Sequence, residues 1–241
     1  MLHKTRGIVF KTTSYSESSV VVQIFTEKFG LQSYLINGVK KAKAKISINV
    51  LQPLHLLDMV VYHKPAGNIQ RVSEVRQLPV FSNIPYDIVK SSLVMFLNEI
   101  LYKSIRQQSA DEVLFEFLFR AIEILDRMEE GVVNFHLYFL LRLTRFLGFF
   151  PDLTKAAGSN YFDLTSGNFT TQIPPHTSII DMPLAGLWRD LLQSNFNNLH
   201  LIQMNTAERR VILSKILEYY RLHIEGFGQI KSHFVLEEVL S

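Results

Sequence analysis

The sequence predicts an α+β fold, with a small β-barrel at the N-terminus followed by a helical domain. Over residues 1–80, short runs rich in β-branched and aromatic residues alternate with turn signals. After Pro79 and Pro85 the hydrophobic period changes from two to about 3.6 residues, which is typical of helices. We therefore expect a barrel domain in residues 1–80 and a helical domain in residues 81–241.

Five runs form the predicted barrel, at residues 7–11, 19–27, 31–38, 51–63 and 69–77. Gly30, Gly38 and the turn sequence Pro-Ala-Gly-Asn at 65–68 separate several of them. The last run alternates imperfectly, so we expect it to be an edge strand. Closing five short strands into a barrel removes exposed sheet edges, which favours a barrel over an open sheet.

Helical patterns follow at residues 85–108, 109–125, 132–147, 184–195, 206–223 and 232–240. Ser109 and Glu112 have the spacing of a capping box, which predicts a helix start at Ser109. The segment 132–147 is apolar nearly all round, which predicts the central helix of a bundle.

Prolines and glycines interrupt the helical pattern between residues 151 and 182. These residues are Pro151, Gly158, Gly167, Pro174 and Pro175. They exclude a continuous helix, so we expect an irregular insertion in the helical domain.

Charge is distributed unevenly along the 241 residues. The net charge is +3, but residues 1–80 hold 11 Lys and Arg against 4 Asp and Glu, whereas the remainder is net acidic. A basic front half predicts a polyanionic partner for the barrel.

The composition also bears on compartment and class. The chain has no cysteine, which excludes disulfides and thiolate zinc sites and fits a reducing, cytoplasmic location. The N-terminus lacks the apolar stretch of a signal peptide. Residues 135–150 are strongly apolar but contain Arg142 and Arg145, each of which costs about 2.5–3.5 kcal/mol at bilayer depth. We therefore expect a buried helix there.

No phosphate-loop, dinucleotide-binding, hydrolase-elbow or zincin motif occurs, and the eight histidines are scattered. The carboxylate pairs Glu129–Glu130 and Glu237–Glu238 are adjacent and fit solvated helix ends. We expect a protein that is not an enzyme and needs no cofactor or metal. A hydrolase with a discontinuous site would require a concave cluster of acids or histidines with perturbed pKa values.

Four lysines lie close together within the predicted barrel, at Lys40, Lys41, Lys43 and Lys45. Such a run fits a solvated loop, a contact with acidic lipid or a clamp on nucleic-acid phosphates. The basic character of the whole barrel favours the third interpretation. The predicted DNA-binding residues are Lys40, Lys41, Lys43, Lys45, Arg6, Lys11, Arg71 and Arg76.

Small barrels of the OB type bind single strands by combining a positive groove with aromatic side chains that stack on bases. The aromatic candidates are Phe10, Tyr15, Phe25, Phe29, Tyr34 and Tyr62. Because aromatics at strand spacing usually fill a core, we expect roughly half to two-thirds of them to be buried. No base-reading motif is present, so binding should depend mainly on backbone charge.

Several segments, taken in order, resemble one known family. The N-terminal part reads GIVFK, TTSYSESSVVVQIFTEKFGLQSYLINGVKKAKAK and LQPLHLLDMVVY. The C-terminal part reads LRLTRFLGFFPDL, ILSKILEYYRLHIEG and IKSHFVLEEVL. Their order and spacing resemble those of RecO recombination mediators over nearly the whole chain.

The resemblance implies an OB-fold barrel followed by a helical domain. It implies binding of single- and double-stranded DNA, annealing of complementary strands coated by single-strand-binding protein and, with RecR, assistance in loading RecA. Arg142 and Arg145 resemble the basic residues that receive the acidic, Phe-ending tail of single-strand-binding protein. The alternative is that these arginines pair with acids such as Glu123 or Asp152.

One departure from the family pattern concerns zinc. Many relatives have a four-cysteine zinc site, whereas this chain reads Thr154-Lys-Ala-Ala157 where the first cysteine pair would fall. We expect no zinc and an insertion held by packing of Tyr161, Phe162 and Phe169. The sequence therefore predicts a DNA repair and recombination accessory protein that acts without catalysis. The alternative is a protein-interaction adaptor whose basic face binds acidic protein segments.

Overall fold

A computed structural model describes residues 1–41, 44–65 and 67–241. These residues form two compact units. The first unit comprises residues 1–86 and 94–126, and the second comprises residues 87–93 and 127–241. The first contains a β-barrel with helical segments, and the second contains helices with a small sheet, so the α+β class is confirmed.

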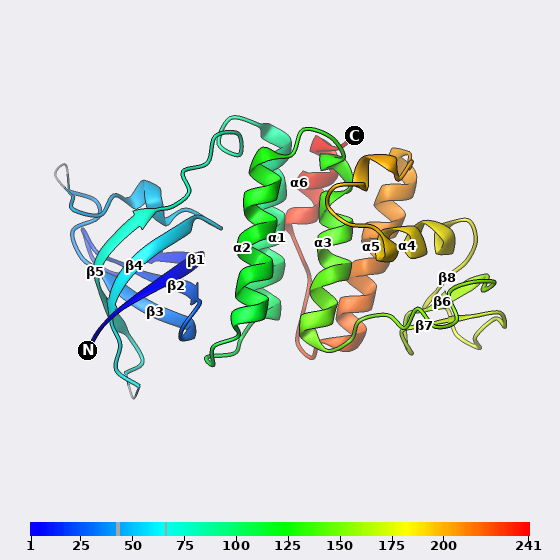
Figure 1. The fold of residues 1–241 in the computed structure, drawn as a ribbon, viewed down its shortest axis with the longest axis horizontal. Coiled ribbons are helices and arrows are strands. Elements are labelled where there is room, and N and C mark those ends of the chain that lie inside the picture. Colours follow the sequence, from blue (N-terminus) through cyan, green and yellow to red (C-terminus); the bar gives the residue numbers. More distant parts are fainter. Residues whose placement is uncertain (42–43, 66) are drawn as a thin grey trace. The chain divides into compact units, whose positions relative to one another are not determined.

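The barrel consists of β1 (Leu2–Ser14), β2 (Val20–Thr26), β3 (Gly30–Ile36), β4 (Leu56–Tyr62) and β5 (Gln70–Gln77). They close in the order β1-β2-β3-β5-β4 (Figure 1), so the predicted five-stranded barrel is confirmed.

The prediction that the fifth run is an edge strand is wrong. β5 pairs antiparallel with β4 and briefly parallel with β3, so both of its sides are hydrogen-bonded. Its imperfect alternation coincides with a register shift opposite Val60 and Val61 of β4, where Ser73 of β5 is skipped in the pairing, and such an extra residue breaks the strict alternation of side chains. The fourth run also differs, because a 3₁₀ helix at Ile48–Leu51 and a turn precede the strand, which begins only at Leu56.

β1 is the long strand that closes the barrel. Its first half pairs with β4 and its second half with β2, with a register shift between Val9 and Lys11. Gly7 lies where both partners approach, and a Cβ atom there would stand 2.6 Å from Cγ2 of Ile24 and 2.7 Å from Sδ of Met59. Only glycine allows this close approach inside the barrel.

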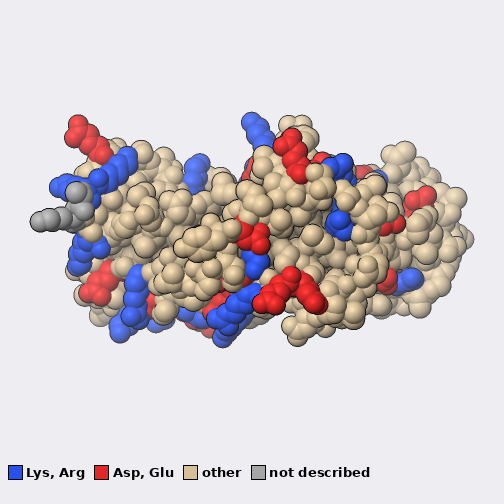
Figure 2. Space-filling model, turned by 90° about the horizontal axis from the view of Figure 1, so that it is seen from above, with Lys and Arg blue, Asp and Glu red and all other residues tan. Residues whose placement is uncertain are grey.

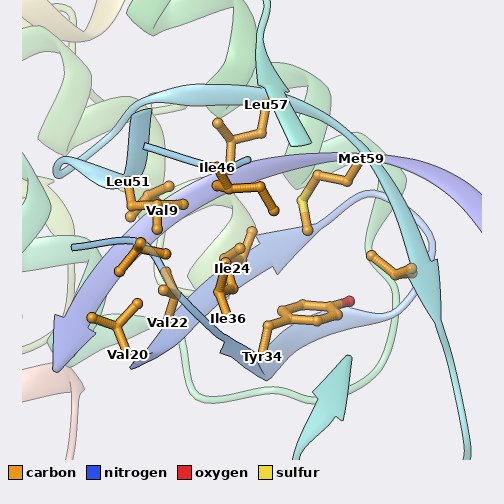
Figure 3. Packing of buried hydrophobic residues seen from close by; sticks show 12 residues of the cluster. Val9, Val20, Val22, Ile24, Tyr34, Ile36, Ile46, Leu51, Leu57 and Met59 are labelled. Carbon is orange, nitrogen blue, oxygen red and sulfur yellow. The ribbon is translucent and has the colours of Figure 1, made fainter. Parts of the chain in front are cut away.

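The barrel interior is filled by aliphatic side chains from all five strands and from the segment between β3 and β4. Figure 3 shows Val9, Ile24, Tyr34, Leu57 and Met59 pointing toward one another within this cluster. The strands alternate between this core and the outer surface, as period-two patterning requires.

Two helices follow the barrel, α1 (Ile88–Ser104) and α2 (Glu112–Arg127). The prediction that Ser109 caps α2 is wrong. The Oδ1 atom of Asp111 accepts the backbone N–H of Leu114 at 2.9 Å, so Asp111 occupies the capping position. Ser109 instead lies against Gly30 at the start of β3, where its carbonyl oxygen leaves no room for a Cβ atom on residue 30.

α2 covers an aromatic outer face of the barrel. Phe10 and Phe25 stack with their ring centroids 5.8 Å apart, and Phe25 contacts Phe115 of α2. The side chain of Asn98 in α1 donates to the carbonyl of Phe10 at 3.0 Å. At the far end of α2, the buried carboxylate of Asp126 accepts the backbone N–H groups of residues 82, 83 and 84. The barrel and these helical segments therefore form one packed body.

The second unit is organised around α3 (Val132–Leu147), which is accompanied by α4 (Leu184–Gln193), α5 (Thr206–His223) and α6 (Ser232–Val239). Ten residues of α3 are buried, and α3 contacts both α4 and α5 (Figure 1). Its predicted central position is confirmed. Asn134 donates to the carbonyls of Leu199 and Ile202, and Tyr220 donates to that of Leu140.

The insertion at 151–182 contains a small sheet of β6 (Tyr161–Asp163), β7 (Asn168–Thr170) and β8 (Ile179–Ile180). Phe162 and Phe169 are buried and contact each other, as expected, whereas Tyr161 is only half-buried. Phe162 also packs on Trp188 of α4 and Tyr219 of α5. The helices thus supply most of the aromatic surface that holds the insertion.

Candidate nucleic-acid interface

Three of the four clustered lysines, Lys40, Lys41 and Lys45, are exposed at one end of the barrel. Lys43 lies outside the described residues. The Nζ atom of Lys40 donates to Oγ of Ser14 at 3.1 Å, which places Lys40 beside the end of β1. Figure 2 shows Lys and Arg side chains gathered over the barrel, with acidic side chains among them. In the described ranges, no ion pair compensates Lys40, Lys41 or Lys45.

Arg6, by contrast, is bound by two carboxylates. Its Nη2 atom lies 2.8 Å from Oε1 of Glu27 and 2.8 Å from Oε2 of Glu116, and its guanidinium lies over the rings of Phe115 and Phe119. Hydrogen bonding to Arg6 lowers the pKa of both Glu27 and Glu116. The charge of Arg6 is therefore compensated within the first unit.

The other predicted cations differ in their surroundings. Arg76 binds Asp58 at 2.6 Å, and Lys11 donates to the hydroxyl of Tyr102 at 3.2 Å while lying over its ring. Arg71 is exposed at the start of β5, opposite the exposed Tyr62 of β4, and takes part in none of the ion pairs found in the described part of the chain. Of the predicted cations, Arg71, Lys40, Lys41 and Lys45 are thus the ones that no acid and no aromatic ring engages among the described residues.

The six aromatic candidates separate into two groups. Phe10, Phe25 and Tyr34 are buried, which agrees with the lower end of the expected fraction. Tyr15 and Tyr62 remain 64% and 46% exposed, and Phe29 is half-buried. Tyr15 directly follows Ser14, so an exposed aromatic side chain adjoins the lysine segment.

Sequence reasoning missed a groove on the outer surface of β2 and β3. Gln23, Lys28, Phe29, Ser33 and His63 are among the residues that line it. Polar residues such as Gln23 and Ser33 lie at outward positions of otherwise apolar strands and pair in register. Polar side chains interrupting two neighbouring apolar strands were the signal that could have indicated this groove.

Two family models match the chain. The N-terminal domain of recombination protein O matches residues 1–81, and the C-terminal domain of the same protein matches residues 85–233. The chain belongs to the RecO family.

Full-length relatives agree with the family assignment. The chain is 36% identical to the DNA repair protein RecO of Azobacteroides pseudotrichonymphae and 38% identical to that of Bacteroides fragilis, with 99% of each chain covered. The DNA repair protein RecO of Flavobacterium psychrophilum is 36% identical, again over 99% of both chains. This RecO family member is thus a DNA repair protein, and the described barrel is the OB-like domain expected of the family.

The two arginines assigned from the RecO resemblance lie on α3. The Arg142 guanidinium is 5.8 Å from the ring centroids of both Tyr138 and Phe150, and Arg145 is exposed three positions later. The acids considered as alternative partners are occupied elsewhere, because Glu123 binds Arg120 and Asp152 accepts from Thr154. Within the described residues neither arginine forms an ion pair.

The residues at the zinc position of RecO relatives do not fit that metal. The chain has no cysteine, and Thr154 is engaged in a turn closed by Asp152. Among the described residues, no group of three or more His, Asp or Glu side chains is arranged to hold a metal ion. In the same described residues, no helix is long and apolar enough to span a membrane.

Proposed function

We propose that this RecO family member binds single- and double-stranded DNA without sequence specificity and anneals complementary strands coated by single-strand-binding protein. The observation that supports this proposal is the exposed, uncompensated charge of Lys40, Lys41 and Lys45 at one end of an OB-like barrel. Arg71, also exposed, adds a further cation on the same barrel.

The mechanism is electrostatic. Each lysine that contacts a phosphate releases condensed counterions, and it lowers the charge of the bound strand. Two complementary strands whose charge is partly neutralised repel each other less, so they pair faster. Backbone contacts of this kind carry no sequence information, and no covalent bond is made or broken.

The proposed partner site for the tail of single-strand-binding protein is the surface around Arg142 and Arg145. Arginine binds a terminal carboxylate through paired hydrogen bonds, and the rings of Tyr138 and Phe150 beside Arg142 offer apolar surface to a terminal phenylalanine. Association with RecR, and through it assistance in RecA loading, belongs to the same proposal and is supported by the family assignment.

A salt titration tests the DNA-binding step. We expect the full chain to bind a fluorescent single-stranded 20-mer, with log K falling linearly with log salt concentration. Replacing Lys40, Lys41, Lys43 and Lys45 by alanine should make the slope shallower by about 2.8, at about 0.7 for each phosphate contact.

The matched control removes the same charge from the second unit, through alanine at Arg127, Lys155, Arg221 and Lys231, all of which are exposed. If the control variant lowers the slope as much as the lysine variant, the lysine segment is not the binding site. If the unmodified chain retains no oligonucleotide at low salt, the adaptor alternative is favoured instead.

Strand annealing tests the second step. Complementary oligonucleotides coated with single-strand-binding protein should anneal faster with the full chain than without it. The double variant Arg142→Ala, Arg145→Ala should lose this acceleration on coated strands while keeping it on bare strands. Deleting the acidic tail of single-strand-binding protein should have the same effect; acceleration that survives both changes contradicts the assigned partner site.

A further inference from the structure

The C-terminal helix α6 covers a part of α3 and α5 in the second unit (Figure 1). The surface beneath it is formed by His136 of α3 and by Arg209, Arg210 and Leu213 of α5, and we call it the α6-binding surface. Between this surface and α6 lies a cavity of about 10 Å³, which is about the room of one water molecule. The contact between α6 and the two longer helices is therefore incompletely filled.

The two arginines of the α6-binding surface lack an anionic partner. The Nη atoms of Arg209 donate to a backbone carbonyl and to a threonine hydroxyl, and its Nε atom is buried without a hydrogen bond to any described residue. Arg210 donates to the backbone carbonyl of Glu237 at 3.3 Å. The carboxylates of Glu237 and Glu238 in α6 take part in none of the ion pairs of the described residues. A carboxylate that reached this cavity would bond a guanidinium that α6 leaves unsatisfied.

Few contacts hold α6 in place. Of its eight residues, all of which the structure describes, Leu236 alone is fully buried, and Leu240, four positions later on the same face, is half-buried. Phe234 and Val235 are 63% and 57% exposed. α4 and α5 pack closely on α3, whereas α6 approaches its neighbouring helices less closely. Because a helix of eight residues is not stable alone in water, α6 depends on this small contact and belongs to the weakly held part of the fold.

The linker that precedes α6 is anchored separately. Phe227 and Ile230 are each 2% exposed, and the ring centroid of Phe227 lies 5.3 Å from that of Tyr220 in α5. These two side chains stay buried if α6 leaves. Release of α6 is therefore confined to residues 231–241 and keeps the α6-binding surface intact.

We propose that the α6-binding surface binds an acidic, leucine-bearing helix of a partner protein, and that α6 is the internal occupant which this helix displaces. Leucines four positions apart take the places of Leu236 and Leu240, and a glutamate between them meets Arg209 and Arg210. The inference does not depend on DNA binding. Because α6 must leave first, the apparent affinity for the partner helix is reduced by the fraction of the chain in which α6 is docked.

The experiment compares two helical peptides. The full chain is titrated by fluorescence anisotropy with a labelled 15-residue peptide that has leucines four apart and glutamates between them, and with a matched peptide in which glutamine replaces every glutamate. The glutamate peptide should bind at least about tenfold more tightly, because only its carboxylates form charge-assisted bonds with the arginines. Hydrogen exchange measured by mass spectrometry should show faster exchange in residues 232–239 when this peptide is bound, with α3 and α5 still protected.

Variants of the chain separate displacement from binding elsewhere. Leu236→Ala and Leu240→Ala weaken the docking of α6, so each should tighten binding of the glutamate peptide by at least about threefold. Arg210→Gln removes a charge from the α6-binding surface and should weaken binding about tenfold. Arg221→Gln is the matched control, because Arg221 is also an exposed arginine of α5 but does not line the cavity, and it should change nothing.

The inference is overturned if the full chain binds neither peptide or binds both equally. It is also overturned if the glutamate peptide binds without faster exchange in α6, if the leucine variants weaken binding, or if Arg210→Gln has no more effect than Arg221→Gln. DNA binding stands in all of these cases. Circular dichroism of each variant checks folding, and Leu240→Ala, which changes a less buried residue, decides the matter if Leu236→Ala is unfolded.

Discussion

Arg6 and Arg71 are the same residue type on the same barrel, but their surroundings assign them different roles. Arg6 is held by Glu27 and Glu116 and lies over two phenylalanine rings of α2, whereas Arg71 is exposed without an ion pair among the described residues. Counting charges in the sequence does not separate the two, because Glu116 lies 110 residues from Arg6 along the chain.

This difference leads to opposite expectations for the two alanine variants. Arg6→Ala should lower the free energy of unfolding by about 1 kcal/mol, because it removes two partly exposed ion pairs and the contacts with two phenylalanine rings, and it should leave the salt slope of DNA binding unchanged. Arg71→Ala should make the slope shallower by about 0.7 and leave stability unchanged. Urea denaturation and salt-titrated anisotropy measure both quantities. A slope that falls equally in the two variants would show that Arg6 also contacts phosphate.

At the scale of single residues, the sequence alone predicted an exposed cation without an ion pair only in the lysine-rich segment, which contains no acidic residue. Four lysines in a six-residue span cannot all be buried or paired locally, so the exposure of Lys40, Lys41 and Lys45 follows from composition alone. The groove at His63 and Gln23 could not be predicted in this way. It forms only where the β2–β3 hairpin meets the segment after β4, and the parallel pairing of β3 with β5 on that side of the barrel joins residues far apart in the sequence.

At the scale of elements, the hydrophobic pattern of the sequence predicted helix bounds best where it was strong and unambiguous. The all-round apolar character of residues 132–147 predicted α3 with its bounds and its central position. The capping signal before α2 was ambiguous, because Ser109 and Asp111 are both favoured capping residues and lie two positions apart. The packing of Ser109 against Gly30 of the barrel decides between them, and that contact joins segments far apart in sequence.

The burial of α3 has a consequence for the pH dependence of stability. His136 is 1% exposed, and burial, with a smaller contribution from the nearby Arg209, lowers its pKa from 6.5 to about 3. Above pH 6.5 the ring is neutral in both the folded and the unfolded chain, so it adds no pH dependence. Between 6.5 and about 3 only the unfolded chain takes up the proton, so stability falls as pH falls.

The expected size of this effect is up to about 1.4 kcal/mol for each pH unit. Urea denaturation at pH 7.5, 6 and 5 should show the free energy of unfolding decreasing across this window. His136→Gln, which cannot titrate, should be less stable at pH 7.5 but show a smaller decrease between pH 6 and 5. Equal decreases in the two proteins would mean that other groups, such as the partly buried His55 with its lowered pKa, account for the trend.

At the scale of the whole molecule, the change in hydrophobic period near residue 80 marks where strands give way to helices. The first compact unit nevertheless extends to Asp126, because helical segments after the barrel cover its aromatic outer face. The hydrophobic period of a segment indicates its secondary structure, whereas the extent of a compact unit depends on which apolar faces pack together. Whether residues 1–80 fold as an independent domain therefore stays a prediction.

Two fragments test that boundary. Residues 1–80 would expose Ile8, Phe10 and Phe25, whose side chains are at most 1% exposed in the full chain. Exposing each costs about 1.5–3 kcal/mol, which together is comparable with the entire stability of a small domain. We therefore expect residues 1–80 to aggregate or to bind a hydrophobic dye. Residues 1–127 keep Phe115 and the Asp126 anchor, so we expect them to unfold cooperatively in urea.

Size-exclusion chromatography and circular dichroism compare the two fragments. Cooperative unfolding of residues 1–80 with the same midpoint as residues 1–127 would establish the barrel as a self-sufficient domain, because the covering helices would then add nothing to its stability.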